Sequence, residues 1–249
     1  MVSDKAGPCF TCFMINVVKV KNREEGQKKA HDLLKKVVDG KTLLALSGGT
    51  SVDYRMILVD PNDAIPGAIT IADERYGEPF HKDSNELLLK NFGVKDWADK
   101  HCVESHKFLR GKSFLETAKE YDKEIEDLFR RFKKKVGVMG VGANLHTAGI
   151  FPYSVAAKSP NFVEAETVED KQSLRSSTSS AGLKFPKRLT LTLKAFGEFT
   201  GFVILMFGEE KKDAVRLMLD DAENDMQKYP AIFYRKSKIK SYLITDQNI

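Results

Sequence analysis

Residues 42–51 read TLLALSGGTS, an apolar run followed at once by two glycines and small hydroxyl residues. Five consecutive uncharged residues before a glycine turn are typical of a strand that is buried on both faces. Residues 136–142, VGVMGVG, repeat this order later in the chain. The two stretches predict buried parallel strands that end in glycine-rich loops, which is the pattern of an α/β sheet.

The rest of the chain alternates in the same way. Further strands are predicted at residues 14–20, 68–72, 202–207 and 241–245. Residues 23–38 place apolar side chains on one helical face, and a helix is also predicted through Tyr54, Met56 and Leu58. Two more helices are predicted, one capped by Asp83 or Ser84 and one that runs from a Ser113 cap to Phe132.

This alternation predicts the α/β class, with a mostly parallel, Rossmann-like sheet covered by helices on both faces. No composition shift marks a boundary, so one domain is expected over residues 1–249. Residues 158–187 have no clear period and are expected to cross the surface as a long excursion. The Ser-rich part, residues 173–182, is either a mobile cover for a site or a plain loop.

Composition describes an ordinary globular protein, with 42% hydrophobic and 30% charged residues. The net charge of +5 is small, and the basic runs at residues 133–135 and 236–240 are short and contain no interleaved aromatic residues, so no nucleic-acid partner is expected. No apolar stretch is long enough for a membrane span, and a cytoplasmic location is expected. The single C-x-x-C at Cys9 and Cys12 is interpreted as chance rather than as a metal or redox site.

The first glycine-rich loop offers backbone N–H groups to a ligand. Ser47, Gly48 and Gly49 follow a predicted strand and precede a predicted helix, so their amides can approach a phosphate closely. The same turn is compatible with an ordinary strand-to-helix connection, since it contains neither a Walker nor a dinucleotide-binding motif.

The second loop carries charge. Asp73, Glu74 and Arg75 follow residues 68–72, and three charged side chains at the end of a buried strand cannot all face the core. The planar guanidinium of Arg75 suits a phosphate or carboxylate ligand, although a structural Arg–Asp pair is the alternative. Asp73 is expected either to orient Arg75 or to hold a sugar hydroxyl.

The third loop, residues 140–152 (GVGANLHTAGIFP), holds His146 between small residues. Imidazole has an ordinary pKa of about 6.5, so it can act as a general base near neutral pH beside amides that glycines expose. A hydrogen-bonded structural histidine is the alternative. His81, His101 and His106 lie outside glycine-rich loops and are interpreted as surface residues.

Five ordered blocks of this chain resemble the 6-phosphogluconolactonase family: SGGTS, DERYGEPFHKDSNE, GVGANLHTAGIFP, PKRLTLTLKAF and FGEEK. The resemblance covers nearly the whole chain. It implies the parallel-sheet architecture that this family shares with the glucosamine-6-phosphate isomerases (deaminases). Two features favour the lactonase branch. Residues 73–75 read D-E-R, whereas the corresponding deaminase sequence resembles D-E-Y, and residues 188–192 read RLTLT, which is similar to the R-x-T-L-T of the lactonases.

The resemblance also implies roles for single residues. The residue that matches His146 is the proposed base of the lactonases, and those that match Arg75, Arg188 and Lys211 lie at or near the substrate phosphate. Lys211 fits the family's G-x-x-K, whereas spacing alone would favour Lys212 equally.

The chain departs from the family motif beside this histidine. The motif reads roughly G-x-G-x-D-G-H-T-A-S-L-F-P, whereas this chain has Asn144 and Leu145 for Asp-Gly and Gly149 for Ser. Asparagine can orient an imidazole but carries no charge, and leucine is costly at a positive φ. Asn144 is therefore expected to act with His146 at the catalytic centre, as part of a weaker base.

These residues predict hydrolysis of 6-phospho-D-glucono-1,5-lactone to 6-phosphogluconate, a reaction of the pentose phosphate pathway. The expected partner is a small phosphorylated sugar lactone, with no cofactor or metal, and the expected state is a monomer or weak dimer. Two alternatives remain open. One is a glucosamine-6-phosphate isomerase/deaminase, and the other is a sugar-phosphate-binding protein whose turnover was lost through Asn144 and Leu145.

Overall fold

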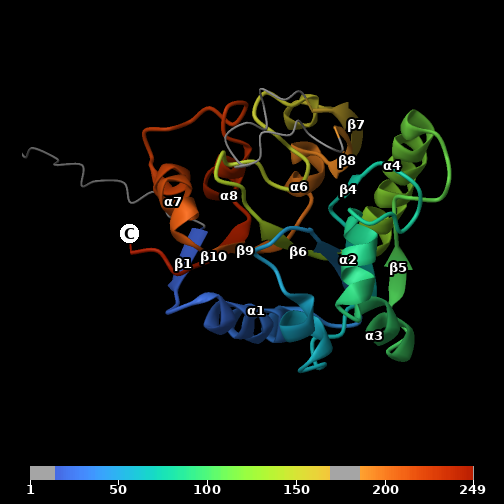
Figure 1. Cartoon of the computed structure of the whole chain (residues 1–249), viewed down its shortest axis with the longest axis horizontal. Coiled ribbons are helices and arrows are strands. Elements are labelled where there is room, and N and C mark those ends of the chain that lie inside the picture. The colour runs from blue at the N-terminus through green and yellow to red at the C-terminus, as the bar shows by residue number, and fades with distance from the viewer. Residues whose placement is uncertain (1–14, 169–185, 249) are drawn as a thin grey trace, which may run out of the picture.

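A seven-stranded parallel sheet forms the centre of the computed structural model, which describes residues 15–168 and 186–248 (Figure 1). The strands, in spatial order, are β1 (Ile15–Lys19), β10 (Lys240–Thr245), β9 (Gly201–Met206), β6 (Lys134–Gly140), β2 (Thr42–Leu46), β3 (Ala68–Ile71) and β5 (Glu104–His106). Every neighbouring pair is parallel. The predicted α/β class with a mostly parallel sheet is confirmed.

The central strands are buried on both faces. All five residues of β2 are buried, as the uncharged run TLLAL predicts for a strand between β6 and β3. The edge strand β1 alternates less clearly and exposes Val17. β5, at the other edge, was not predicted because its three residues ESH contain no apolar side chain.

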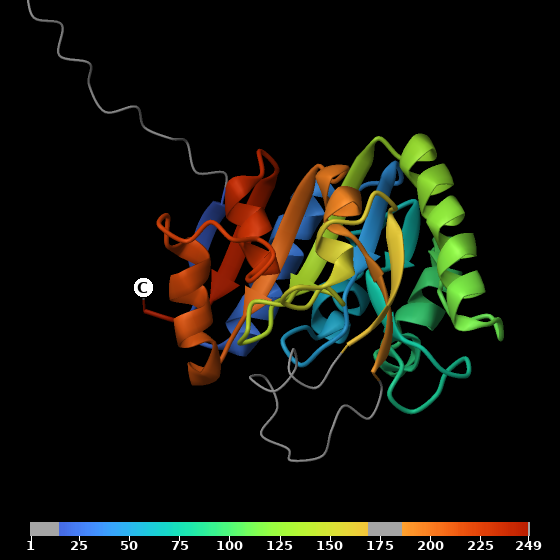
Figure 2. The same ribbon diagram turned by 90° about the horizontal axis from the view of Figure 1, so that it is seen from above.

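Helices cover both faces of this sheet, as predicted. They are α1 (Arg23–Val37), α2 (Asn85–Asn91), α3 (Val94–Lys100), α4 (Phe114–Arg131), α6 (Leu193–Gly197), α7 (Lys212–Leu219) and α8 (Phe233–Lys236). Figure 1 shows α1 beneath the sheet and α6 and α8 above it, and Figure 2 shows the same layers from above. No helix in the described ranges has the length and apolar character that a membrane crossing requires.

Two of the predicted helix starts carry a side-chain cap. Asn22 Oδ1 accepts the N–H of Glu25 at 2.9 Å, and Ser84 Oγ accepts the N–H of Leu87 at 3.0 Å. Ser84 rather than Asp83 therefore caps α2. The predicted helix through Tyr54 is instead a single π-helical turn, η1 (Arg55–Val59). The part of the chain that the structure describes also has three short 3₁₀ turns: η2 (Val155–Ala157), η3 (Glu209–Lys211) and η4 (Pro230–Ile232).

A second, three-stranded antiparallel sheet was not predicted. Its strands are β4 (Asp73–Arg75), β8 (Lys187–Leu191) and β7 (Val163–Thr167), in that spatial order. The prediction that residues 158–187 form a long surface excursion is therefore wrong at both ends of this range, where β7 and the start of β8 lie. β7 reads VEAET and buries Glu166, which accepts hydrogen bonds from Ser154 and Val155, so the charged side chain hides the strand pattern.

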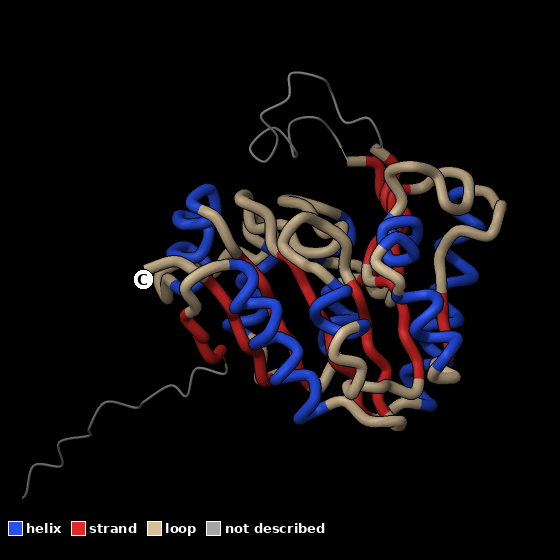
Figure 3. Tube along the Cα trace, turned by 60° about the horizontal axis from the view of Figure 1, so that its bottom comes forward, coloured by secondary structure: helices blue, strands red, loops and turns tan. Residues whose placement is uncertain are grey.

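Some predictions lie outside the described residues: the Ser-rich loop 173–182, the cysteines Cys9 and Cys12, and the start of the first predicted strand at Met14. Within the described part, Figure 3 shows the strands side by side between helices, with loops joining their ends. The polar residues of interest lie in the loops after β2 and β6 and on β4, which follows β3.

Candidate active site

One cavity of about 330 Å³ collects residues from loops that are far apart in the chain. Its walls include eight residues that the sequence analysis singled out: Ser47, Gly48, Gly49, Asp73, Arg75, His146, Arg188 and Lys211. Asn144, the ninth, is buried and contacts the cavity through His146. This placement is the one that parallel strands with their carboxyl ends at a common edge should produce.

Asn144 sets the tautomer of His146. Its Oδ1 accepts the backbone N–H of His146 at 3.2 Å and lies 2.5 Å from the ring Nδ1. A backbone N–H can only donate, so the amide atom that faces it is the oxygen, and Nδ1 must carry a proton to share that oxygen. Nε2 is then unprotonated, with a lone pair that can accept a proton.

Two neighbours pack closely against the imidazole ring of His146. Phe151 stacks against it with ring centroids 4.6 Å apart and an interplanar angle of 14°. Gly142 also packs against the ring, because a Cβ atom there would stand 2.1 Å from it, so no larger residue fits at this position. The N–H of Gly142 also donates to the His146 carbonyl at 2.9 Å. The ring orientation is therefore fixed before any ligand arrives.

The environment keeps His146 neutral. Burial, and then the positive charges of Lys211, Arg188 and Arg75, lower its pKa to about 3. At neutral pH the ring is thus a proton acceptor rather than a cation. The three cations act on this histidine because they line the same cavity.

Those cations lack a direct ion-pair partner among the described residues. Arg75 on β4 and Arg188 on β8 are direct cross-strand partners, a placement that is unfavourable for like charges. Among the described residues, neither arginine nor Lys211 lies within ion-pair distance of a carboxylate, and Arg188 Nε is buried without a hydrogen-bond partner. Burial lowers the pKa of Arg188 to about 10, and burial also lowers that of Lys211. An anion with several oxygens would satisfy these donors.

Lys211 rather than Lys212 belongs to this site. Lys211 lines the cavity, whereas Lys212 Nζ lies 2.7 Å from Glu209 Oε1 in an exposed ion pair. The structure thus separates two lysines that spacing alone left equal.

Asn85 is a cavity residue that the sequence analysis did not include in the site. Its Oδ1 accepts a hydrogen bond from Arg75 Nη1 at 2.5 Å, and its Nδ2 donates to the backbone carbonyl of Asp73 at 2.7 Å. The alternative of an Arg75–Asp pair is therefore not seen. Asp73 is buried, accepts the N–H of Gly48, and has a raised pKa because burial outweighs the nearby Arg75 and Arg188.

The glycine-rich loop after β2 contributes less than predicted. The N–H of Ser47 donates to the Val138 carbonyl at 3.0 Å, and that of Gly48 donates to Asp73. Of these three amides only that of Gly49, at φ 101°, has no partner among the described residues. The following element is a π turn, so no helix begins at this loop to add its dipole.

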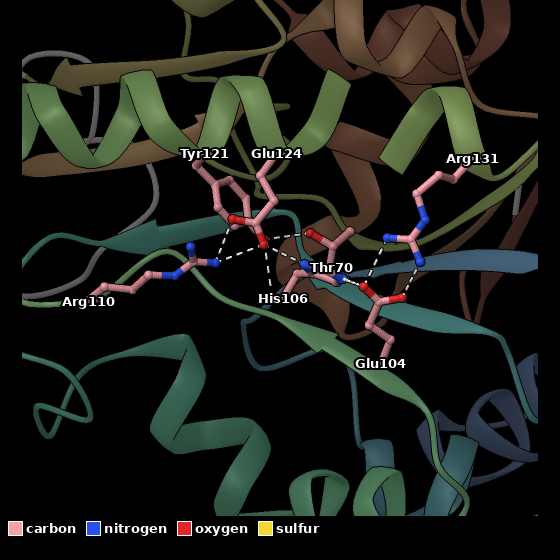
Figure 4. Close-up of polar contacts among 7 residues, drawn as sticks. All are labelled: Thr70, Glu104, His106, Arg110, Tyr121, Glu124 and Arg131. Carbon is pink, nitrogen blue, oxygen red and sulfur yellow. Dashed lines mark hydrogen bonds and ion pairs between the residues drawn. The ribbon is translucent and has the colours of Figure 1, made fainter. Parts of the chain in front are cut away.

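His106 is a correction to the sequence analysis, because it is not a surface residue. Its side chain is 12% exposed, its Nε2 lies 2.9 Å from Glu104 Oε1, and its Nδ1 contacts Glu124 (Figure 4). Arg131 and Arg110 bind the same two carboxylates. This network joins β5 to α4, and none of its members lines the cavity of His146.

Comparison with known proteins identifies the family of this chain. The profile of the glucosamine-6-phosphate isomerases/6-phosphogluconolactonase family matches residues 22–243. The chain belongs to this family. A 6-phosphogluconolactonase from Neisseria meningitidis serogroup A is 30% identical over 199 residues, covering 77% of this chain and 78% of that relative.

Relatives with the other activity of the family are similar to this chain as well. A glucosamine-6-phosphate deaminase from Lactococcus lactis subsp. cremoris is 26% identical over 211 residues, covering 83% of this chain and 86% of that relative. Family membership alone therefore does not decide between the two reactions.

Solved structures of the family share the fold. A 6-phosphogluconolactonase from Shewanella baltica superposes with a TM-score of 0.66 at 22% identity, over 94% of this chain and 98% of that one. A 6-phosphogluconolactonase from Trypanosoma brucei gives a TM-score of 0.70 at 18% identity, over 94% and 97% of the two chains.

The departures from the family motif have visible structural consequences. Leu145 has φ 62°, in the left-handed region that glycine favours, and its side chain is completely buried in the core. The expected backbone cost is present, and burial of the leucine offsets it. Gly149 stands where a Cβ would lie 2.8 Å from Thr190 Cβ, and its N–H donates to Thr190 Oγ1 at 3.0 Å. A serine would therefore be crowded at this position.

Proposed function

We propose that this protein hydrolyses 6-phospho-D-glucono-1,5-lactone to 6-phosphogluconate, a step of the pentose phosphate pathway, with His146 as the general base. The observation that carries the proposal is the hydrogen bonding of one imidazole ring, that of His146. The hydrogen bonds of Asn144 leave His146 Nε2 unprotonated in a cavity that also holds three unpaired cations. A base and an anion site in one cavity fit a phosphorylated substrate that must be attacked by water.

The reaction begins when Nε2 of His146 takes a proton from a water molecule as its oxygen attacks the C1 carbonyl. The carbonyl oxygen becomes an oxyanion, for which the N–H of Gly49 is an available donor. The C1 bond to the ring oxygen then breaks, and the imidazolium returns its proton to that oxygen. The ring opens to the carboxylic acid, which ionises in solution.

The positive groups hold the substrate by its phosphate. In this proposal the phosphate contacts Arg75, Arg188 and Lys211, and the Asp73 carboxylate accepts a hydrogen bond from a sugar hydroxyl. Because the phosphate does not change during the reaction, these contacts stabilise the ground state and the transition state alike. They govern KM, whereas His146 governs kcat.

Two sequence features support lactone hydrolysis over deamination within the family. Arg75 stands where the deaminases resemble D-E-Y, and Asn144 replaces the aspartate on which their proton transfers rely. Asn144 still orients His146, which is all that a lactonase base requires of it.

The test is a lactonase assay corrected for spontaneous hydrolysis, with wild-type and His146→Ala proteins side by side. We expect His146→Ala to lower kcat by about 10² to 10⁴ and to leave KM nearly unchanged. Turnover equal to the spontaneous rate in the wild type, together with tight 6-phosphogluconate binding, would indicate a binding protein instead. Ammonia release from glucosamine 6-phosphate would indicate a deaminase.

A further inference from the structure

Glu74 is a buried carboxylate that stands behind the proposed phosphate site. It lies on β4 between Asp73 and Arg75, but it is fully buried and does not line the cavity. It therefore cannot touch a substrate. Glu74 pairs with Leu189 across the small sheet, and its side chain faces the start of α2.

The Glu74 carboxylate accepts three backbone N–H groups. Its Oε1 accepts from Arg75 at 2.7 Å and from Asn85 at 2.7 Å, and its Oε2 accepts from Glu86 at 2.9 Å. The last two amides belong to the first turn of α2, where backbone N–H groups have no partner within the helix. Glu74 thus fastens the end of β4 to the beginning of α2.

This clamp fixes the side chain that orients Arg75. Asn85 Oδ1 accepts from Arg75 Nη1 at 2.5 Å, so the position of the Asn85 backbone decides where the guanidinium points. Asn85 has little freedom to move, because its amide packs so tightly on Gly48 that a Cβ there would lie 2.0 Å from Oδ1. A change at Glu74 would therefore reach the cavity through Asn85 and Arg75.

We propose that Glu74 is a positioning residue for anion binding, which holds Asn85 in register so that the guanidinium of Arg75 meets the substrate phosphate. The inference rests on the proposed function only in taking the phosphate as the ligand of Arg75. It assigns to Glu74 no contact with substrate and no part in proton transfer.

Glutamine at position 74 is the sharpest replacement. Three N–H donors converge on the carboxylate, and they favour its charged form, whereas burial raises its pKa to about 7. A glutamine has almost the same shape but turns one acceptor oxygen into an N–H₂ donor, which must face at least one of the backbone N–H groups. At least one anchor of the clamp is then lost without a cavity being made.

The experiment measures binding of 6-phosphogluconate and of inorganic phosphate by calorimetry, with the full chain. We expect Glu74→Gln to weaken binding of both anions by about tenfold, which corresponds to about 1.4 kcal/mol, because one anchor of the clamp is lost. In an Arg75→Ala background the same change should have no further effect, because Glu74 acts only through Arg75. Where lactonase turnover is measured, KM should rise while kcat stays within about twofold of the wild type.

Glu166→Gln is the matched control. Glu166 is another buried carboxylate of the small sheet that accepts a backbone N–H, from Val155 at 3.3 Å, but it lies outside the cavity. The Glu166→Gln protein should be less stable than the wild type but should bind both anions equally well. If Glu74→Gln does not fold, Glu74→Asp replaces it, because the shorter carboxylate cannot reach all three N–H groups, with the same expected loss and the same absence of effect beside Arg75→Ala.

The results separate this inference from the proposed function. Unchanged anion affinity in a folded Glu74→Gln protein, or an equal loss in the Arg75→Ala background, would overturn the positioning role. A tenfold loss confined to the arginine-containing background supports it even if the wild type shows no lactonase activity. If the wild-type protein binds neither 6-phosphogluconate nor inorganic phosphate, both proposals are overturned.

Discussion

Arg75 and Arg188 stand directly opposite each other on β4 and β8, and in the described ranges no acidic side chain forms an ion pair with either. Two arginines in this position repel each other, and Arg188 is also 9% exposed with a buried, unsatisfied Nε. The folded protein carries this cost in the absence of an anion. The arrangement is therefore unfavourable for stability and favourable for binding.

Replacement of Arg188 by methionine should reverse that balance. Without ligand, Arg188→Met should raise the free energy of unfolding by about 1 kcal/mol or more, because an apolar side chain of similar length removes a buried charge. The variant should also lose most of the stabilisation that 6-phosphogluconate gives the wild type. Thermal unfolding with and without 6-phosphogluconate measures both effects.

Arg216→Met provides the comparison for that experiment. Arg216 is 58% exposed on α7 and lies 3.9 Å from Asp213, outside the cavity. Its replacement should change the unfolding temperature little and should leave the response to 6-phosphogluconate intact. A lower unfolding temperature for ligand-free Arg188→Met would show that the arginine stabilises the fold.

The parts of this protein that sequence predicts well are those in which local pattern and tertiary environment agree. β2 and β6 are central, and their apolar runs reflect burial on both faces. Loops that follow such strands meet at one edge, so the convergence of Arg75 and His146 was predictable from the loop positions.

The parts that sequence predicts poorly depend on partners that only the fold provides. β7 was missed because Glu166 is buried against Ser154 rather than exposed. Asn85 was left out of the site because its role comes from a contact with Arg75 across a turn. The contact of Glu166 leaves no period in the sequence, and the block DERYGEPFHKDSNE contains Asn85 without showing that it binds Arg75.

The lowered pKa of His146 predicts a pH profile. Because this pKa is about 3, the ring is already neutral across the working range and should add no acid limb of its own to kcat/KM between about pH 5 and pH 8. Asn144→Asp places a carboxylate beside Nδ1, which favours the protonated ring and raises its pKa. The variant should therefore lose activity as the pH falls through this raised pKa, at a higher pH than the wild type does.

Initial rates, corrected for spontaneous hydrolysis at each pH, provide the measurement. Substrate protonation affects wild type and variant equally, so the ratio of their kcat/KM values isolates the histidine. A wild-type acid limb near pH 6.5 would mean that burial and the three cations do not depress the pKa of His146 in solution.

The same lowered pKa predicts a loss of stability in acid. In the unfolded chain His146 binds a proton near pH 6.5, whereas in the folded protein it does so only near pH 3. Between these values the unfolded state binds more protons, so the free energy of unfolding falls as the pH is lowered. Between pH 7.5 and pH 5 the loss from this group is at most about 2 kcal/mol.

Urea unfolding of wild-type and His146→Phe proteins at the two pH values isolates this contribution. Phenylalanine preserves the stacking on Phe151 but cannot bind a proton. The variant should lose less stability in acid than the wild type, by the amount assigned to the histidine. An equal loss in both proteins would place the acid sensitivity in other groups.

Leu145 tests whether the family's glycine would be the better residue at this position. Leu145→Gly relieves a backbone held at φ 62°, which costs on the order of 1–3 kcal/mol for a side chain with a Cβ. It also removes a completely buried side chain, which costs about 2–5 kcal/mol when leucine is truncated, and glycine adds further chain entropy. The sum predicts that Leu145→Gly lowers the free energy of unfolding by about 1–3 kcal/mol.

Ala148→Gly separates the two contributions to that sum. Ala148 has φ 48° in the same loop and is only partly buried, so its replacement relieves a similar backbone cost while removing a single methyl group. It should leave stability unchanged or slightly higher, as measured by urea unfolding beside Leu145→Gly. If both glycine variants proved more stable than the wild type, backbone strain would outweigh the burial of Leu145, and the leucine would require a reason other than packing. If only Leu145→Gly is destabilised, the core contact explains why this chain tolerates leucine beside His146.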